Sequence, residues 1–133
     1  MANVLIIDDD PVSRTTLKNI LQNLGYTTFE ADNGQYGTNL YRQNRPDVVM
    51  LDLLMPGKDG FETLFDLRNI HREAKIIMMT GGGRITIDLY QRLAVIAIPE
   101  LLSKPFSAEG AAKAVATALN NAERDRILQN TSP

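Results

Sequence analysis

Side chains that can bind a metal or transfer a phosphoryl group stand at the ends of four apolar runs of the sequence. The pair Asp8-Asp9 follows the first run, and the other three end at Asp52, Thr80 and Lys104. If these runs are parallel strands, their carboxyl ends lie at one edge of a sheet, where open α/β sheets place their ligands. The sequence therefore predicts one site that contains all five side chains.

The types of these residues indicate the chemistry of the site. Three carboxylates close together repel one another, and bound protons or a hard cation can relieve that repulsion. The chain has no cysteine and one histidine, and ligands that are all oxygen suit Mg²⁺. The lysine offers a positive charge and the threonine a hydrogen bond to a phosphoryl oxygen. The set favours phosphoryl transfer with an aspartate as the nucleophile.

Asp52 is the central residue of this set. It ends the run Val48–Leu51, which begins after Pro46 and leads into a turn that contains Pro56-Gly57. A single aspartate in such a place is more often a helix cap or a turn residue. Because three further runs end in chemically active groups, we prefer the functional interpretation.

Length and composition fit one domain with an ordinary core: the chain has 133 residues, of which 44% are hydrophobic and 23% charged. A net charge of −2 and a pI near 5.3 argue against a nucleic-acid or membrane surface, which would need an excess of basic residues. No apolar run reaches the roughly 18 residues of a membrane span. The N-terminus has no basic leader. We therefore expect a cytoplasmic protein.

Hydrophobic runs and turn signals predict five strands that alternate with five helices. Strands are expected at 4–7, 26–30, 48–52, 75–80 and 101–104, and helices at 11–24, 34–45, 60–71, 85–93 and from 107 to a point between Asn121 and Arg126. Asp10 and Ser107 are expected to cap the first and last helices. Crossovers of this length suit a parallel sheet with helices on both faces, which is an α/β fold.

Helical spacing predicts which side chains of the first three helices face the sheet. They are Val12, Leu17, Ile20, Leu21 and Leu24 in the first, Tyr36, Leu40 and Tyr41 in the second, and Phe61, Leu64, Phe65 and Leu67 in the third. Arg14, Lys18, Glu30 and Asp32 are interpreted as ordinary surface charges unless a partner shows otherwise. His71 is interpreted as a positively charged residue near the C-terminal end of the third helix, where the helix dipole favours a positive charge.

Four motifs stand at the ends of the first, third, fourth and fifth strands: Leu5–Pro11, Asp52–Gly60, Thr80 and Lys104–Phe106. In type and order they resemble the response-regulator receiver domain of two-component signalling, over about residues 3 to 120. The resemblance implies the flavodoxin-like (βα)5 fold of chemotaxis regulators, a doubly wound five-stranded parallel sheet in strand order 2-1-3-4-5. The receiver domain would span residues 1–122. Residues 123–133 would be a helix end and a polar tail, either disordered or the start of a linker.

The resemblance also implies roles for the acidic residues. Asp52 would accept a phosphoryl group from a histidine kinase or a histidine phosphotransfer protein. Asp9 would bind Mg²⁺ directly and Asp8 through a water molecule. The Asp52 carboxylate and the backbone carbonyl of Leu54 would complete the protein ligands.

The remaining site residues would hold the transferred group. Thr80 would hydrogen-bond the phosphoryl group, helped by the backbone N–H of Gly81, and Lys104 would pair with a phosphoryl oxygen. Pro105 resembles the family's cis proline, which would help to aim that lysine.

The implied protein is a phosphorylation-controlled binding module, not an enzyme for other substrates: it catalyses only its own phosphorylation and dephosphorylation. The face of the last two helices and the fifth strand would change its partners, in a monomer or a phosphorylation-dependent dimer, without direct contact to nucleic acid or membrane. One alternative is a Mg²⁺-dependent phosphatase with an aspartyl-phosphate intermediate, but its usual general acid is replaced by Leu54. Another is a receiver-like scaffold that is never phosphorylated, which leaves the complete set of site residues unexplained.

Several positions depart from the family pattern. Leu101 stands where a switching tyrosine or phenylalanine is usual, Gly81–Gly83 form an unusual run, and Ile96–Glu100 replace a Gly-Ala pair, either as core or as a partner surface. We therefore hypothesise that switching orders the glycine loop instead of turning an aromatic ring. Leu54 and Gly82, whose side chains hold no water, are predicted to affect hydrolysis of the phosphoryl group.

Overall fold

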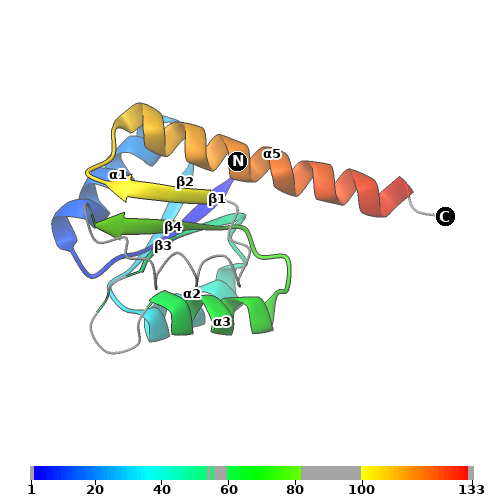
Figure 1. Ribbon diagram of the computed structural model, residues 1–133, viewed down its shortest axis with the longest axis horizontal. Helices are drawn as coiled ribbons and strands as arrows, with labels where there is room; N and C mark the ends of the chain where they lie inside the picture. The colour runs from blue at the N-terminus through cyan, green and yellow to red at the C-terminus, as the bar shows by residue number, and fades with distance from the viewer. Residues whose placement is uncertain (1, 54, 56–59, 82–99, 132–133) are drawn as a thin grey trace, which may run out of the picture.

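The computed structural model describes residues 2–53, 55, 60–81 and 100–131, with side chains for all of these except 100 and 121–131. Within these residues the chain forms one sheet between two layers of helices (Figure 1). None of the described helices combines the length and the apolar character that a membrane span requires.

The sheet has five parallel strands in the order β2-β1-β3-β4-β5. They are β1 (Asn3–Ile7), β2 (Thr27–Ala31), β3 (Val48–Asp52), β4 (Ile76–Gly81) and β5 (Glu100–Lys104). Each begins and ends within one residue of its predicted bounds. The predicted α/β class and strand order are therefore confirmed.

Four helices are described: α1 (Pro11–Asn23), α2 (Gly34–Asn44), α3 (Gly60–Ile70) and α5 (Ala108–Thr131). The helix expected at 85–93 lies outside the described residues. The predicted end of the last helix between Asn121 and Arg126 is wrong, because α5 continues to Thr131. The segment after Asn121 contains alanine, glutamate, arginine and leucine and has neither glycine nor proline before Pro133, so nothing in it stops a helix. Figure 1 shows α5 extending past the body of the domain.

The helix caps agree with the predictions. The Asp10 carboxylate accepts a hydrogen bond from the backbone N–H of Val12 (3.1 Å), and Pro11 is the first helical residue. Gly25 follows the C-cap of α1 with φ 92°, a conformation that glycine adopts without strain. The Ser107 hydroxyl accepts from the backbone N–H of Gly110 (2.9 Å) at the start of α5.

The sheet separates two buried hydrophobic clusters, because successive side chains of a strand point to opposite faces. One cluster lies under α2 and α3 and includes Leu5, Ile7, Val49, Leu51, Leu64, Leu67 and Met78. The other lies under α1 and α5 and includes Val4, Ile6, Leu17, Leu21, Met50, Ile77, Met79, Ala111 and Val115. With β1, β3 and β4 covered on both faces, the positions of their carboxyl ends are firmly fixed.

The predicted inward faces of the helices are too broad. Val12, Leu24, Tyr36 and Phe65 are each more than half exposed. Val12, Leu24 and Tyr36 lie in the first turn or at the cap of a helix, and Phe65 lies one residue beyond the buried Leu64, which turns it about 100° around the helix axis. Helical periodicity identified the core-facing stripe but not its width.

Candidate functional site

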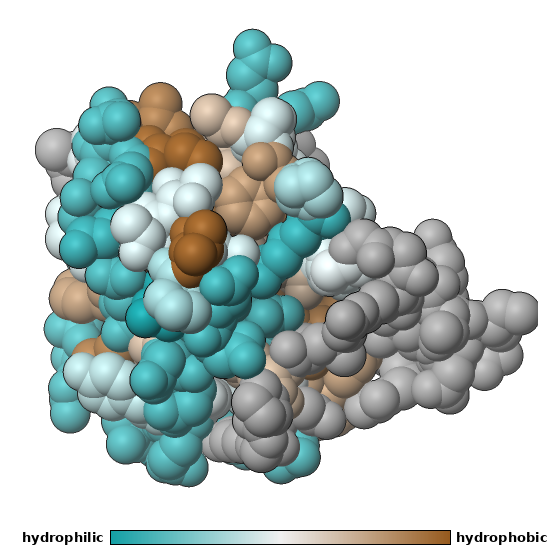
Figure 2. Space-filling view, turned by 90° about the vertical axis from the view of Figure 1, so that its left-hand side faces the viewer, coloured by the Kyte–Doolittle hydropathy of each residue, from teal (hydrophilic) through white to brown (hydrophobic). Residues whose placement is uncertain are grey.

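The carboxyl ends of four strands bring the chemically active residues to one edge of the sheet. β1 leads directly into Asp8, β3 ends at Asp52, β4 carries Thr80 next to its end, and β5 ends at Lys104. The ladder places Asp52 opposite Met79, while β5 runs beside the end of β4. Viewed from this edge, the surface is largely hydrophilic, with small hydrophobic patches (Figure 2).

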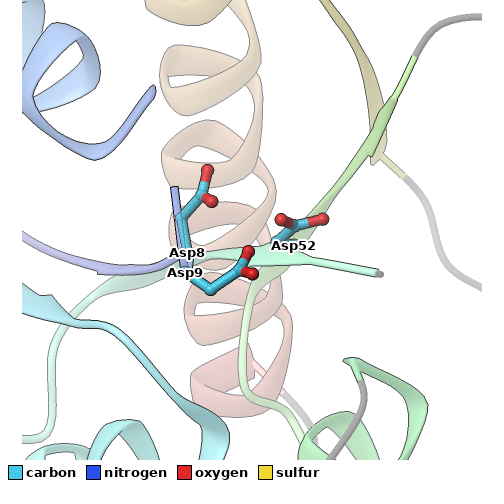
Figure 3. Close-up of side chains that lie close together, drawn as sticks. All are labelled: Asp8, Asp9 and Asp52. Carbon is cyan, nitrogen blue, oxygen red and sulfur yellow. The ribbon is translucent and has the colours of Figure 1, made fainter. Parts of the chain in front are cut away.

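Asp8, Asp9 and Asp52 form a compact acidic group. One carboxylate oxygen from each lies within 4.8 Å of the others, and Figure 3 shows the three side chains gathered where β1 and β3 end. Asp8 and Asp52 are buried, whereas Asp9 is exposed. Two buried carboxylates and one exposed carboxylate therefore face the same small space.

Lys104 bridges the two buried carboxylates. Its Nζ lies 2.7 Å from Asp8 Oδ2 and 3.3 Å from Asp52 Oδ2. Burial alone would lower the pKa of Lys104, but the hydrogen bond to Asp8 and the charges of Asp52 and Asp8 outweigh it and raise that pKa above its usual value of 10.5. The lysine is thus charged at neutral pH. One positive charge faces three carboxylates, so the group carries an excess of negative charge when all three are ionised.

Thr80 holds a hydroxyl without a partner. Only 2% of the residue is exposed, and its Oγ1 makes no hydrogen bond within the part of the chain that the structure describes. A buried hydroxyl is normally hydrogen-bonded, because removing it from water without compensation costs free energy. This hydroxyl, on the strand beside Asp52, is available to a ligand.

The loop that carries the first two aspartates is held by several hydrogen bonds. The Asp8 carboxylate accepts from the backbone N–H of Asp10 (2.9 Å), and the Asp8 N–H donates to the Ala31 carbonyl (3.0 Å). Arg14 Nη1 donates to the Asp8 carbonyl (2.8 Å). The interpretation of Arg14 as an ordinary surface charge missed this contact. The only signal in the sequence is a basic residue one turn into the helix that follows the acidic pair.

Gly60 permits the chain to return onto the end of β3. Its N–H donates to the Leu53 carbonyl (3.1 Å). A Cβ at this position would lie 2.6 Å from Leu53 Cα and would overlap the backbone oxygen of Asp52. The close approach therefore requires glycine. Leu54, whose carbonyl was predicted as a ligand, lies outside the described residues.

The structure also bears on the family features expected around Lys104. The Lys104–Pro105 peptide bond is cis, as predicted. Leu101 on β5 is 40% exposed. Its side chain is aliphatic, where the family pattern has an aromatic ring. Gly81 ends β4, while Gly82, Gly83 and most of the 96–100 segment lie outside the described residues.

Comparison with known proteins decides the family. The model of the response regulator receiver domain matches residues 4–116. The chain belongs to this family. The receiver domain is 34% identical over 103 residues to sporulation initiation phosphotransferase F of Bacillus subtilis, covering 77% of this chain and 82% of the relative. It is 33% identical over 120 residues to the chemotaxis protein CheY of the same organism, covering 88% and 97%.

A solved structure supports the receiver fold independently. NtrX from Brucella abortus superposes with a TM-score of 0.91 at 23% sequence identity, over 99% of this chain and 30% of the NtrX chain. The receiver domain thus spans less than a third of that protein, and at this identity the likeness concerns the fold alone. Together the matches assign the chain to two-component signalling.

Proposed function

We propose that this receiver domain accepts a phosphoryl group on Asp52 from a histidine kinase or a histidine phosphotransfer protein, with Mg²⁺ as cofactor. The observation that carries the proposal is the surroundings of Asp52: two further carboxylates within 4.8 Å and a lysine that contacts it at 3.3 Å. The hydroxyl of Thr80, which has no hydrogen-bond partner among the described residues, adds a donor for the new group.

The acidic group fits Mg²⁺. Asp8, Asp9 and Asp52 offer only oxygen ligands, which this ion prefers, and Lys104 balances no more than one of their charges. The Leu54 carbonyl remains part of the proposed ligand set. When bound, Mg²⁺ offsets the negative charge that the phosphoryl oxygens carry during transfer.

The chain's own residues would carry the transfer. A carboxylate oxygen of Asp52 attacks the phosphorus of phosphohistidine, the P–N bond breaks, and its electron pair stays on the imidazole nitrogen, which takes up a proton from solvent. Lys104 then exchanges its contact with Asp52 for one with a phosphoryl oxygen, and Thr80 donates its hydroxyl proton to another. The product is an acyl phosphate on Asp52.

Phosphorylation would change which proteins the domain binds. Receiver domains act between a kinase or phosphotransfer protein and an output partner. We place the output partner at the face of β5, α5 and the helix expected at 85–93, where Leu101 is exposed. Because position 101 carries no aromatic ring, we propose that capture of the phosphoryl group by Thr80 orders the loop 81–83. Equal amide exchange of residues 80–86 with and without beryllofluoride would contradict this form of switching.

Intact mass after incubation with acetyl phosphate, with and without Mg²⁺, tests the function. The wild-type protein is expected to gain one phosphoryl group only with Mg²⁺, and Asp52→Asn to gain none. Asp32→Asn is a matched control, because Asp32 is exposed and its carboxylate accepts a hydrogen bond from the side chain of its neighbour Asn33 (2.7 Å).

The other outcomes identify the alternatives. An adduct that persists in Asp52→Asn would overturn the role of Asp52. No adduct under any condition, also with a phosphorylated histidine phosphotransfer protein, would favour the unphosphorylated scaffold. Continuous release of phosphate from small phosphate esters would favour the phosphatase.

A further inference from the structure

Arg14 reaches from α1 to the peptide bond between the first two aspartates. Its Nη1 donates a hydrogen bond of 2.8 Å to the backbone carbonyl of Asp8. That carbonyl belongs to the planar peptide unit that joins Asp8 to Asp9, so the contact fixes the orientation of the unit. The residues that it joins, Asp8 and Asp9, supply two of the three carboxylates of the proposed metal site.

Arg14 is itself held in place by β2. Its Nε lies 3.4 Å from Glu30 Oε1, and the second carboxylate oxygen of Glu30 lies 3.3 Å from Lys18 Nζ. The Arg14 side chain is only 20% exposed, against 41% for Lys18. Glu30 thus orients the guanidinium and balances its charge, and Lys18 completes the group from the next turn of α1.

Two effects of Arg14 on a divalent cation have opposite signs. As a positive charge near the acidic group, it would weaken cation binding by repulsion. As a hydrogen-bond donor that holds the Asp8–Asp9 peptide, it would strengthen binding by keeping both carboxylates in position. The contacts favour the second effect, because the guanidinium bonds the Asp8 carbonyl at 2.8 Å and its charge is paired with the Glu30 carboxylate at 3.4 Å.

We propose that Arg14 is a positioning residue for the divalent metal of this receiver domain, held by Glu30 and acting through the Asp8 carbonyl. The inference rests on the proposed Mg²⁺-dependent function and goes beyond it, because it assigns to the Arg14–Glu30 pair a part in metal affinity.

Isothermal titration with Mg²⁺ on the unphosphorylated protein tests the inference, with Mn²⁺ and its paramagnetic signal as a second probe. Arg14→Met keeps the length of the side chain and removes its donors, and is expected to raise the Kd about tenfold, as loss of a partner that orients metal ligands does. Lys18→Met removes the same charge from the same helix without touching Asp8, and should stay within about twofold of wild type because exposed charges act weakly. Arg14→Lys can still donate a hydrogen bond to the carbonyl, so its Kd should lie between those of wild type and Arg14→Met.

A kinetic measurement separates positioning from a general loss of structure. The rate at which acetyl phosphate modifies Asp52 should fall more in Arg14→Met at limiting Mg²⁺ than at saturating Mg²⁺. An equal loss at both concentrations would overturn the proposal, because damage to the fold would then explain it.

The direction of the change in Kd decides the matter. If Arg14→Met binds Mg²⁺ as tightly as wild type, or more tightly, Arg14 acts only as a charge and the inference fails. If Arg14→Met does not fold, Glu30→Gln can replace it, because this variant keeps the arginine but removes the charge that holds it. An unchanged Kd for Mg²⁺ in Glu30→Gln would also contradict the inference. Wild-type protein without measurable Mg²⁺ binding would instead refute the proposed function, and the inference with it.

Discussion

Polar groups are paired at the amino edge of the sheet, where the strands begin, and are unbalanced at the carboxyl edge, where the strands end. At the amino edge, the Asn3 N–H donates to the Asp47 carboxylate (2.8 Å), the Asp47 N–H donates to the Asn3 carbonyl (2.9 Å), and nearby Tyr41 Oη and His71 Nδ1 are hydrogen-bonded (3.0 Å). The carboxyl edge instead has three carboxylates around one lysine, and a Thr80 hydroxyl that finds no partner in the part of the chain that the structure describes.

The difference separates stability from function within one fold. The paired groups at the amino edge stabilise the structure, whereas the unbalanced charge and the free hydroxyl at the carboxyl edge cost stability and leave groups ready for a cation and a phosphoryl group. Substitutions of the same chemical kind should therefore have opposite effects on stability at the two edges.

The largest effect is expected where the carboxyl edge is held by close backbone contacts. Gly60→Ala should lower the free energy of unfolding by about 3 kcal/mol, because its Cβ would meet the backbone of Asp52 and Leu53, which has no room to move. Gly37→Ala in α2 meets only side-chain atoms of Ile7, the nearest at 2.5 Å, and gains helix propensity. Urea unfolding of both variants checks this, and an equal loss in the two would contradict it.

Removing one buried hydroxyl from each edge should give opposite signs. Tyr41→Phe loses the hydrogen bond to His71 and should destabilise by about 1 kcal/mol. Thr80→Val keeps the shape of the side chain and removes a hydroxyl without a partner, so it should stabilise by about 1 kcal/mol. Urea midpoints without Mg²⁺ measure both. A destabilised Thr80→Val would mean that the hydroxyl is satisfied in solution.

Neutralising one aspartate at each edge extends the test to charge. Asp9→Asn relieves repulsion by Asp8 and Asp52, and without Mg²⁺ should raise the melting temperature by about 2 to 4 °C. Asp47→Asn should lower it, because the Asn3 N–H loses a charged acceptor. Added Mg²⁺ should stabilise the wild-type protein and so reduce the difference in melting temperature between Asp9→Asn and wild type. A gain that is the same with Mg²⁺ would argue against a cation among these carboxylates.

Alkali should affect the two edges in the same direction. The pKa of Lys104 is raised by its carboxylate partners despite burial, and burial raises the pKa of Tyr41 despite the nearby charges of Arg45 and Arg68. Folding therefore favours the protonated form of both groups. Their contribution to the free energy of unfolding is complete below the unfolded pKa values, 10.5 for Lys104 and 10.0 for Tyr41. It is lost as the pH rises through the pKa values of the folded protein. Lys104→Met and Tyr41→Phe should each show a shallower fall of stability above pH 10, measured by urea unfolding, and an unchanged slope would refute the assignment.

The smallest effect is expected from the end of α5, which belongs to neither edge. Among the side chains of this helix that the structure describes, which end at Asn120, the buried ones lie between Ala111 and Ala118. Removing residues 123–133, beyond the predicted domain boundary, should change the melting temperature by less than about 2 °C, since this end of α5 extends past the body of the domain (Figure 1). Scanning calorimetry measures this, and a large drop would move the boundary toward the C-terminus.

The strands and their active ends could be predicted from the sequence because central parallel strands are apolar throughout, and their carboxyl ends must meet at one edge. The same logic predicts that Asp8, Asp52 and Lys104 lie together. It could not show that Lys104 contacts Asp8 more closely than Asp52, because such contacts depend on side-chain conformation.

Other features depend on three-dimensional context that periodicity does not contain. Val12 and Phe65 have the helical spacing of core residues but are exposed, since the width of a buried stripe depends on what packs against it. Arg14 resembles a surface charge until β2 places Glu30 beside it. The predicted end of α5 is too early, because mixed charges suggest a frayed terminus but are equally compatible with a continuous helix.

The length of α5 has a mechanical consequence. Leu119 is the last described side chain of this helix that packs against the core, and the 12 residues from Asn120 to Thr131 continue the helix as an arm about 18 Å long, past the body of the domain (Figure 1). A stiff arm magnifies motion at its base, so a tilt of about 10° at the sheet would carry its far end through about 3 to 4 Å. A shift at β5 too small to alter the packing of the domain would thus become a displacement about as large as an amino-acid side chain at Thr131.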